Sequence, residues 1–196
     1  MKNNQLVFAF LTILFLGFMS GCDNTADSYV ISQERAIAGL FSGISSDGVG
    51  NVNVHFSENF RIVVTTDSNL QYRVLTTVNN NILRITQSTG AFNPTKLTID
   101  VHLPVLNSIS LHGAGNFTIN NGSASEFNMA LTGTGNIYAQ NFQVQHLTIT
   151  HSGVGTARIW ATNSLNGNHT GVGNILYRGN PTKNIISTGI GDIRSL

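Results

Sequence analysis

Cysteine is almost absent from this sequence: among 196 residues, Cys22 is the only one. A lone cysteine cannot form a disulfide within the chain, which excludes a fold held together by internal bridges. Long apolar runs are missing too, because the most apolar stretch, residues 6–18, is shorter than the roughly 20 residues that a helix needs to span a bilayer. The lone cysteine and the short apolar stretch must therefore have a purpose other than a disulfide or a membrane-spanning helix.

Charge is scarce as well, since Asp, Glu, Lys and Arg together make up 10% of the residues. Without residues 1–21, which include Lys2, nine basic and nine acidic residues remain. Nucleic-acid binding depends on grouped Lys and Arg side chains, whereas the basic residues here are scattered singly. We therefore predict no nucleic-acid partner.

The amino terminus has the layout of a secretion signal. Met1 and Lys2 supply a positive region, and the apolar stretch 6–18 has the length of a signal core. Met19-Ser20-Gly21-Cys22 then resembles the lipobox of bacterial lipoproteins, although Met19 stands where Leu is usual. We predict a lipoprotein signal peptide over residues 1–21, a lipid (palmitate) on Cys22 and a polar tether over residues 22–38. The alternative is an ordinary signal peptide that ends near a free cysteine.

Glycine is abundant, and from residue 113 it recurs in a regular motif. First glycines of five Gly-x-Gly pairs fall 20, 20, 18 and 18 residues apart. A related segment, residues 47–52, lies upstream and outside this series. We expect the glycines to form sharp corners, because glycine adopts backbone angles that other residues resist. The predicted corner residues are Gly113, Gly115, Gly133, Gly135, Gly153, Gly155, Gly171, Gly173, Gly189 and Gly191.

Alternate residues around each corner are mostly apolar, which is the period of a strand with one buried face. One such unit cannot bury its apolar face alone, so the units must stack at about 4.8 Å per rung. We predict an all-β fold, a right-handed parallel β-helix (solenoid) with a strand-rich, less regular N-terminal part. Residues following the corners should form an outer ladder: Asn116, Asn136, Thr156, Asn174 and Asp192.

Residues 39–105 are strand-rich without a regular repeat. Alternating or β-branched segments predict strands at 49–56, 60–66, 72–78, 82–87 and 97–103. Asn79-Asn80-Asn81 predicts a hairpin turn between the third and fourth of these.

Several side chains suggest chemistry. His151 and His169 fall in the same register of consecutive rungs and should both face inward. They could form a hydrogen-bonded pair of neutral rings or be two ligands of a metal ion. We favour the hydrogen-bonded pair, because no third metal ligand is evident. His112 is one position out of phase and should face solvent. Tyr138 and Trp160 either form a sugar-binding platform or simply cover strands, because their offsets from the corner differ.

Acidic residues are too few for two other functions. Calcium-binding solenoids place Asp regularly beside their glycines, and here only Asp192 does so. Polysaccharide lyases and hydrolases need paired carboxylates or calcium, whereas residues 101–196 contain only Glu126 and Asp192. The acids upstream are dispersed: Asp47, Glu58, Asp67 and Asp100. We predict no metal site, no cofactor and no enzymatic activity.

Five features of residues 39–196 point to one family: Leu40-Phe41-Ser42-Gly43-Ile44, Asn81-Ile82-Leu83-Arg84-Ile85, Leu103-Pro104-Val105-Leu106, the Gly-x-Gly-Asn/Asp series and Tyr177-Arg178-Gly179-Asn180-Pro181. In these features the chain resembles the bacterial family called putative auto-transporter adhesin, head GIN domain. This resemblance implies a β-helical domain exported to the envelope, often as a lipoprotein, and it supplies no reaction.

Together these observations predict a noncatalytic, adhesin-like envelope lipoprotein whose β-helix presents a flat Asn/Thr/Ser surface to a glycan or another envelope protein. The alternatives are a carbohydrate-active β-helix enzyme using an upstream acid and a purely structural envelope component. The membrane is the partner of the N-terminal lipid. Asp23 after the lipidated cysteine resembles an inner-membrane retention signal, whereas an adhesin would need the outer membrane, so both locations stay open.

Overall fold

The computed structural model describes residues 29–196, so the predicted signal peptide, Cys22 and Asp23 lie outside the described residues. The described part of the chain is nearly all-β, with almost no helix, and forms a single 15-stranded sheet that coils upon itself. Its elements are β1 (Val30–Glu34), β2 (Gly43–Ser46), β3 (Asn51–Phe56), β4 (Arg61–Asp67), the 3-10 helix η1 (Ser68–Arg73), β5 (Val74–Asn79), β6 (Ile82–Gln87), β7 (Leu97–Leu103), β8 (Ser108–Leu111), β9 (Ala114–Ile119), β10 (Ser123–Leu131), β11 (Thr134–His151), β12 (Ala157–His169), β13 (Ile175–Arg178), β14 (Thr182–Ser187) and β15 (Ile193–Ser195).

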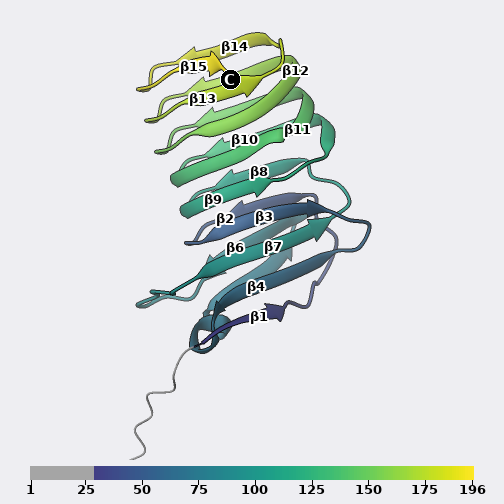
Figure 1. Cartoon of the computed structure of the whole chain (residues 1–196), viewed down its shortest axis with the longest axis vertical. Helices are drawn as coiled ribbons and strands as arrows, with labels where there is room; N and C mark the ends of the chain where they lie inside the picture. Colours follow the sequence, from purple (N-terminus) through teal and green to yellow (C-terminus); the bar gives the residue numbers. More distant parts are fainter. Residues whose placement is uncertain (1–28) are drawn as a thin grey trace, which may run out of the picture.

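The C-terminal part is the predicted β-solenoid, with rungs stacked along the long axis (Figure 1). Parallel pairs β9–β11, β11–β12, β12–β13 and β13–β15 form one side. Parallel pairs β8–β10, β10–β11, β11–β12 and β12–β14 form another, because β11 and β12 bend and contribute to both. The prediction of stacked parallel strands is confirmed.

Rungs of different length still stack in register. In β11, Tyr138 and Gln143 are five residues apart, whereas their partners in β12, Arg158 and Trp160, are two residues apart. Val144 and His146 are then two residues apart, whereas their partners Ala161 and Ser164 are three apart. These irregularities lie at the bend away from the corners. The spacing of the glycines therefore falls from 20 to 18 residues without disturbing the corners.

The two glycines of each corner serve different purposes. Gly135, a second glycine, has a φ of +145°, and the second glycines of the other corners are also in positive φ. Gly133, a first glycine, has no such angle; a Cβ there would overlap the carbonyl oxygens of Gly113 and His112 in the rung before. Backbone angle thus explains only the second glycine, and close approach of neighbouring rungs explains the first.

Residues 47–52 belong to the same stack, which corrects the expectation that they lie outside the series. Val49 bridges Ala114, and β3 pairs in parallel with β9. On the other side of the stack β2 pairs with β8. The segment is the rung directly before the first regular one, and the excursion through β4–β7 separates it in sequence.

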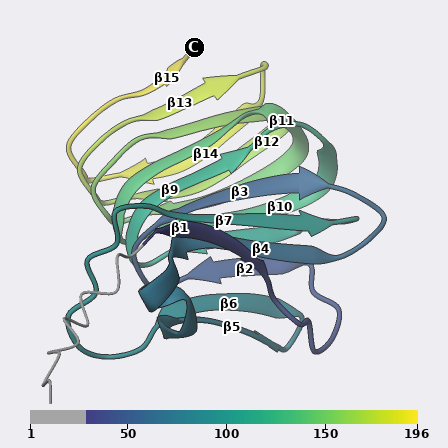
Figure 2. The same ribbon diagram turned by 60° about the horizontal axis from the view of Figure 1, so that its bottom comes forward.

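The N-terminal end closes with antiparallel strands. β1 pairs with β4, which pairs with β7, and η1 lies beside them, as the view of that end in Figure 2 shows. Val30–Glu34, which fall within the predicted tether over residues 22–38, form a strand instead. Asn80 and Asn81 have φ of 50° and 60° in the turn between β5 and β6, as the hairpin prediction requires.

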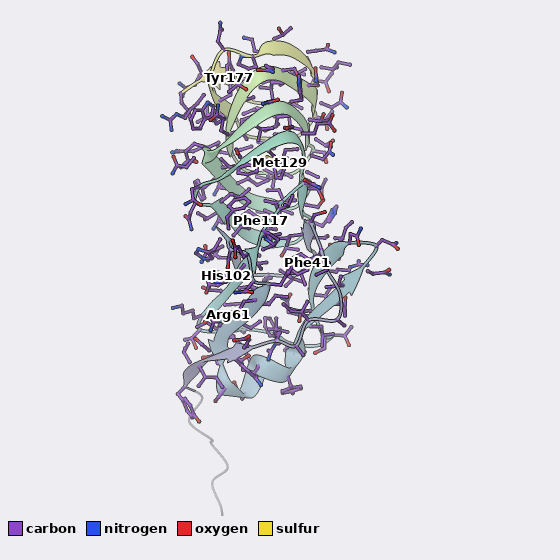
Figure 3. The ribbon with its side chains drawn as sticks, turned by 90° about the vertical axis from the view of Figure 1, so that its right-hand side faces the viewer. Phe41, Arg61, His102, Phe117, Met129 and Tyr177 are labelled. Atoms are coloured by element: carbon purple, nitrogen blue, oxygen red, sulfur yellow. The ribbon has the colours of Figure 1, made fainter. Side chains whose placement is uncertain are left out.

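A single apolar core runs through the stack (Figure 3). Phe117, Phe127 and Phe142 are its largest fully buried side chains. The inward column that contains Phe127, Leu147 and Leu165 ends at Lys183, whose Nζ donates to the Tyr177 hydroxyl at 2.9 Å. No helix among residues 29–196 is long and apolar enough to cross a membrane.

Candidate functional site

Two rows of outward side chains cross eight strands on one side of the molecule, and we call them the polar face. Strand register fixes both rows from β5 through β6, β2, β8, β10, β11 and β12 to β14. The first row is Thr77, Arg84, Ser45, Ser110, Ala130, Thr150, Asn168 and Ile186; the second is Asn79, Ile82, Gly43, Ser108, Asn128, Thr148, Asn166 and Asn184.

Short side chains with hydroxyl or amide groups dominate the polar face. Asn128, Thr148 and Thr150 are exposed, whereas Met129 and Ile149 between them point inward and are buried. This alternation is the reason that the sequence predicted an Asn/Thr/Ser surface. A shallow hollow of about 150 Å³ lies across β8, β10 and β11 on this face.

The polar face deepens at the β5–β6 hairpin into an open groove of about 680 Å³. Its lining comes from segments far apart in sequence: Ser45, Asp47, Thr77, Asn79, Asn80, Ile82, Arg84 and His112. The prediction that His112 faces solvent agrees with its exposure. Its Nδ1 lies 2.6 Å from the Thr132 hydroxyl oxygen of the next rung.

The groove holds one carboxylate. Asp47 accepts hydrogen bonds from Arg84 Nε and, at 3.0 Å, from the Ser45 hydroxyl. No other groove residue is acidic. Asp67 is buried and accepts a hydrogen bond from the Thr95 backbone N–H at 2.6 Å, so it lies away from the groove. The groove can hydrogen-bond a polar ligand, but it does not assemble the pair of carboxylates that glycoside hydrolysis uses.

His151 and His169 meet inside the stack, as the sequence predicted. Both are fully buried, and their Nδ1 atoms are 2.7 Å apart. His151 Nε2 lies 3.0 Å from the Gly155 carbonyl oxygen and must donate to it. His151 Nδ1 therefore accepts a hydrogen bond from His169 Nδ1–H. The pKa of His151 lies below its ordinary value, chiefly because of burial and secondly because of His169.

A polar cluster that sequence reasoning missed lies on strands β3 and β7, outside the polar face. His55 and His102 stack with ring centroids 4.7 Å apart, and Asp100 Oδ1 accepts a hydrogen bond from Asn53 Nδ2 at 2.9 Å. Burial, and then the charges of His55 and Arg61, lower the pKa of His102. Within residues 29–196 no three His, Cys, Asp or Glu side chains are placed to hold a metal ion. The period of two predicts that these residues face outward, yet only the β3–β7 register brings them together.

The predicted outer ladder begins one rung earlier than expected. Asn51 Oδ1 accepts a hydrogen bond from Asn116 Nδ2 at 2.9 Å, and Asn116 Oδ1 accepts one from Asn136 Nδ2 at 3.1 Å. Asn136 Oδ1 accepts from the Thr156 backbone N–H at 2.9 Å. The ladder resumes where Asn174 Oδ1 accepts from the Asp192 backbone N–H at 2.8 Å. The amide side chains of this ladder are used in holding the corners together.

Tyr138 and Trp160 do not form a joint platform. Tyr138 is in register with Arg158, whereas Trp160 is in register with Gln143 and Arg178. Each ring instead lies against the arginine of the following rung.

Fold and surface together define a β-solenoid protein that displays a broad, polar, ordered face. The model of the family described as putative auto-transporter adhesin, head GIN domain, matches residues 40–121 and 113–181. The chain belongs to this family, which confirms the resemblance. Membership indicates an adhesin-like protein of the cell surface or envelope.

The chain is similar to several solved structures, and the first of them shows the same fold. A putative adhesin from Bacteroides fragilis NCTC 9343 is 22% identical, with a TM-score of 0.57, over 86% of this chain and 97% of that one. A putative adhesin from Parabacteroides distasonis ATCC 8503 is 20% identical, with a TM-score of 0.41, over 87% and 98%. A putative lipid binding protein from the same strain is 18% identical, with a TM-score of 0.44, over 84% and 96%. No curated protein matches the chain.

Proposed function

We propose that the protein is a noncatalytic lipoprotein of the bacterial envelope that binds a glycan or another envelope protein through its polar face. Family membership supports the adhesin-like role. The predicted lipid on Cys22 would hold the domain at a membrane, with residues 23–29 as the link to β1.

The observation that carries the proposal is the pair of registered rows across eight strands. Ser, Thr and Asn side chains there offer both donors and acceptors, and they have few rotatable bonds. Because strands already fix their spacing, binding would cost little ordering of the surface. Arg84 is the only charged side chain in the two rows, so recognition would rest on hydrogen bonding rather than on charge.

The groove gives this surface a place with depth. A ligand entering it would meet the hydroxyls of Ser45 and Thr77 and the amides of Asn79 and Asn80. Arg84 and Asp47, already paired, would add charged donors and acceptors. Such a convergent set suits the many hydroxyl groups of a sugar chain or the backbone of an extended peptide.

The test is a screen of detergent-solubilised protein on glycan arrays and against envelope extracts. A partner that binds the wild type should be lost with Thr148→Arg, which puts a large charged side chain in the middle of the polar face. Gln145→Arg is the matched control: Gln145 is in the same strand but lines a hollow with Ser123 and Ser125, outside both rows. Equal binding by the wild type and Thr148→Arg would refute the proposed surface.

A further inference from the structure

Three arginines and two aromatic rings form a compact patch on the side of the solenoid that carries β9, β13 and β15. We call it the arginine–aromatic patch. Register arranges it in two columns, one of Tyr138, Arg158, Leu176 and Arg194 and one of Trp160 and Arg178. Strands β11, β12, β13 and β15 supply these residues, and the polar face includes none of them.

The rings hold two of the guanidinium groups. Arg158 lies over the Tyr138 ring at 5.9 Å from its centroid, and Arg178 lies over the Trp160 ring at 5.2 Å. Arg178 Nη1 also donates to the Gln140 carbonyl oxygen at 3.1 Å. Cation–π contact fixes the plane of a guanidinium group while leaving donors at its edge available. The arginines are therefore positioned before any ligand arrives.

Leu176 fills the centre of the patch. Strand alternation places it between the inward residues Ile175 and Tyr177, so it belongs to the outer surface, yet it is only 7% exposed. Long arginine side chains can cover apolar surface with their stems while their charged ends reach water. The patch thus carries charge at its surface, and its aliphatic member is covered.

Positive charge in the patch is barely neutralised. Residues 101–196 contain two acids, Glu126 and Asp192, and four basic residues, of which the patch holds three. Among the ion pairs of residues 29–196, only Arg194 of these three takes part, with Asp192 at 3.9 Å between exposed side chains. An exposed pair of this kind contributes little.

We propose that the arginine–aromatic patch binds an acidic polysaccharide, such as a polyuronate. Guanidinium groups bind carboxylates with two parallel hydrogen bonds. Arg158 and Arg194 are two rungs apart in one column, about 10 Å at the usual strand spacing. Cations fixed on a rigid lattice match a polymer whose carboxylates repeat at fixed intervals. An anionic lipid surface suits the patch less well, because Leu176 is covered and cannot insert.

Affinity electrophoresis of the detergent-solubilised full chain through gels containing polygalacturonate tests the proposal, with neutral dextran and phosphatidylglycerol vesicles as the other probes. We expect binding to polygalacturonate that weakens as salt rises. Arg158→Gln and Arg178→Gln should each reduce affinity roughly tenfold, the loss typical of one charged hydrogen-bonding group. Arg178→Lys should retain part of the binding, because lysine keeps the positive charge but cannot offer a carboxylate the two parallel N–H donors of a guanidinium group.

Arg61→Gln is the matched control, since it removes an exposed arginine of β4 that pairs with Glu34 outside the patch. It should leave polygalacturonate binding unchanged. Urea melts of each variant check that the fold persists. Absence of polygalacturonate binding, an equal loss with Arg61→Gln, or vesicle binding that Arg158→Gln and Arg178→Gln reduce in place of polymer binding would overturn the proposal.

Discussion

Replacing Gly135 by valine adds a branched side chain at a corner where two separate costs arise. Its φ of +145° is one that residues with a Cβ rarely adopt, which costs about 1–3 kcal/mol. A Cβ there would also overlap the carbonyl oxygen of Gly115 in the rung before, and such overpacking costs about 1–3 kcal/mol more. Gly135→Val should therefore lower the free energy of unfolding by about 2–6 kcal/mol.

Urea melts followed by circular dichroism measure this loss. Gln143→Ala is the control: Gln143 is exposed, and its removal should change stability by at most about 0.5 kcal/mol. Gly133→Ala should cost less than Gly135→Ala, because Gly133 meets the neighbouring rung without a positive φ. Coincident melts of Gly135→Val and Gln143→Ala would refute the account of the corner.

The remaining predictions concern the tether and the buried histidines. Cys22→Ser should abolish labelling by a fatty-acid analogue and stable membrane association, so equal labelling of wild type and mutant would contradict the lipid assignment. If Asp23 retains the protein in the inner membrane, sucrose-gradient fractionation should find it in the light fraction and Asp23→Ser in the heavy one; wild-type protein in the heavy fraction would reject retention. Because the folded pKa of His151 is depressed, the unfolded chain binds its proton first, and stability should fall by up to about 1.4 kcal/mol per pH unit as pH drops below about 6.5. The double change His151→Leu and His169→Leu, which continues the column of Leu111 and Leu131, should flatten this dependence in urea melts at pH 7.5 and 5.5; an unchanged slope would contradict it.

The solenoid was predictable because its evidence is local and repeated. Each corner places Gly-x-Gly next to alternating apolar residues, so inward positions such as Ile137 and Ile149 follow from the period of two. The pairing of His151 with His169 follows from their equal position, two residues before the first glycine of the corner, Gly153 or Gly171. The hairpin at Asn80 and Asn81 also follows, since asparagine tolerates positive φ.

The parts of the fold and site that the sequence does not predict depend on contacts between segments that are distant in sequence. Residues 47–52 join the stack only because β3 pairs with β9 across the excursion that contains β4–β7, and no repeat in that excursion signals the return. The sequence predicts β1 as part of the tether because the segment around it is mostly polar, and its strand conformation comes from pairing with β4. The groove unites three segments through the same long-range pairing. Periodicity alone carries no information about these neighbours.

Photo-crosslinking from a benzoyl-phenylalanine at position 148, in bacterial cells that export the protein, tests the central claim most directly. Position 148 is exposed in the middle of the polar face, and position 145, exposed in the same strand outside both rows, is the reference. The account predicts a crosslinked glycan or envelope protein from position 148 and none from position 145. Equal adducts at both positions, or none at position 148, would contradict binding through the polar face.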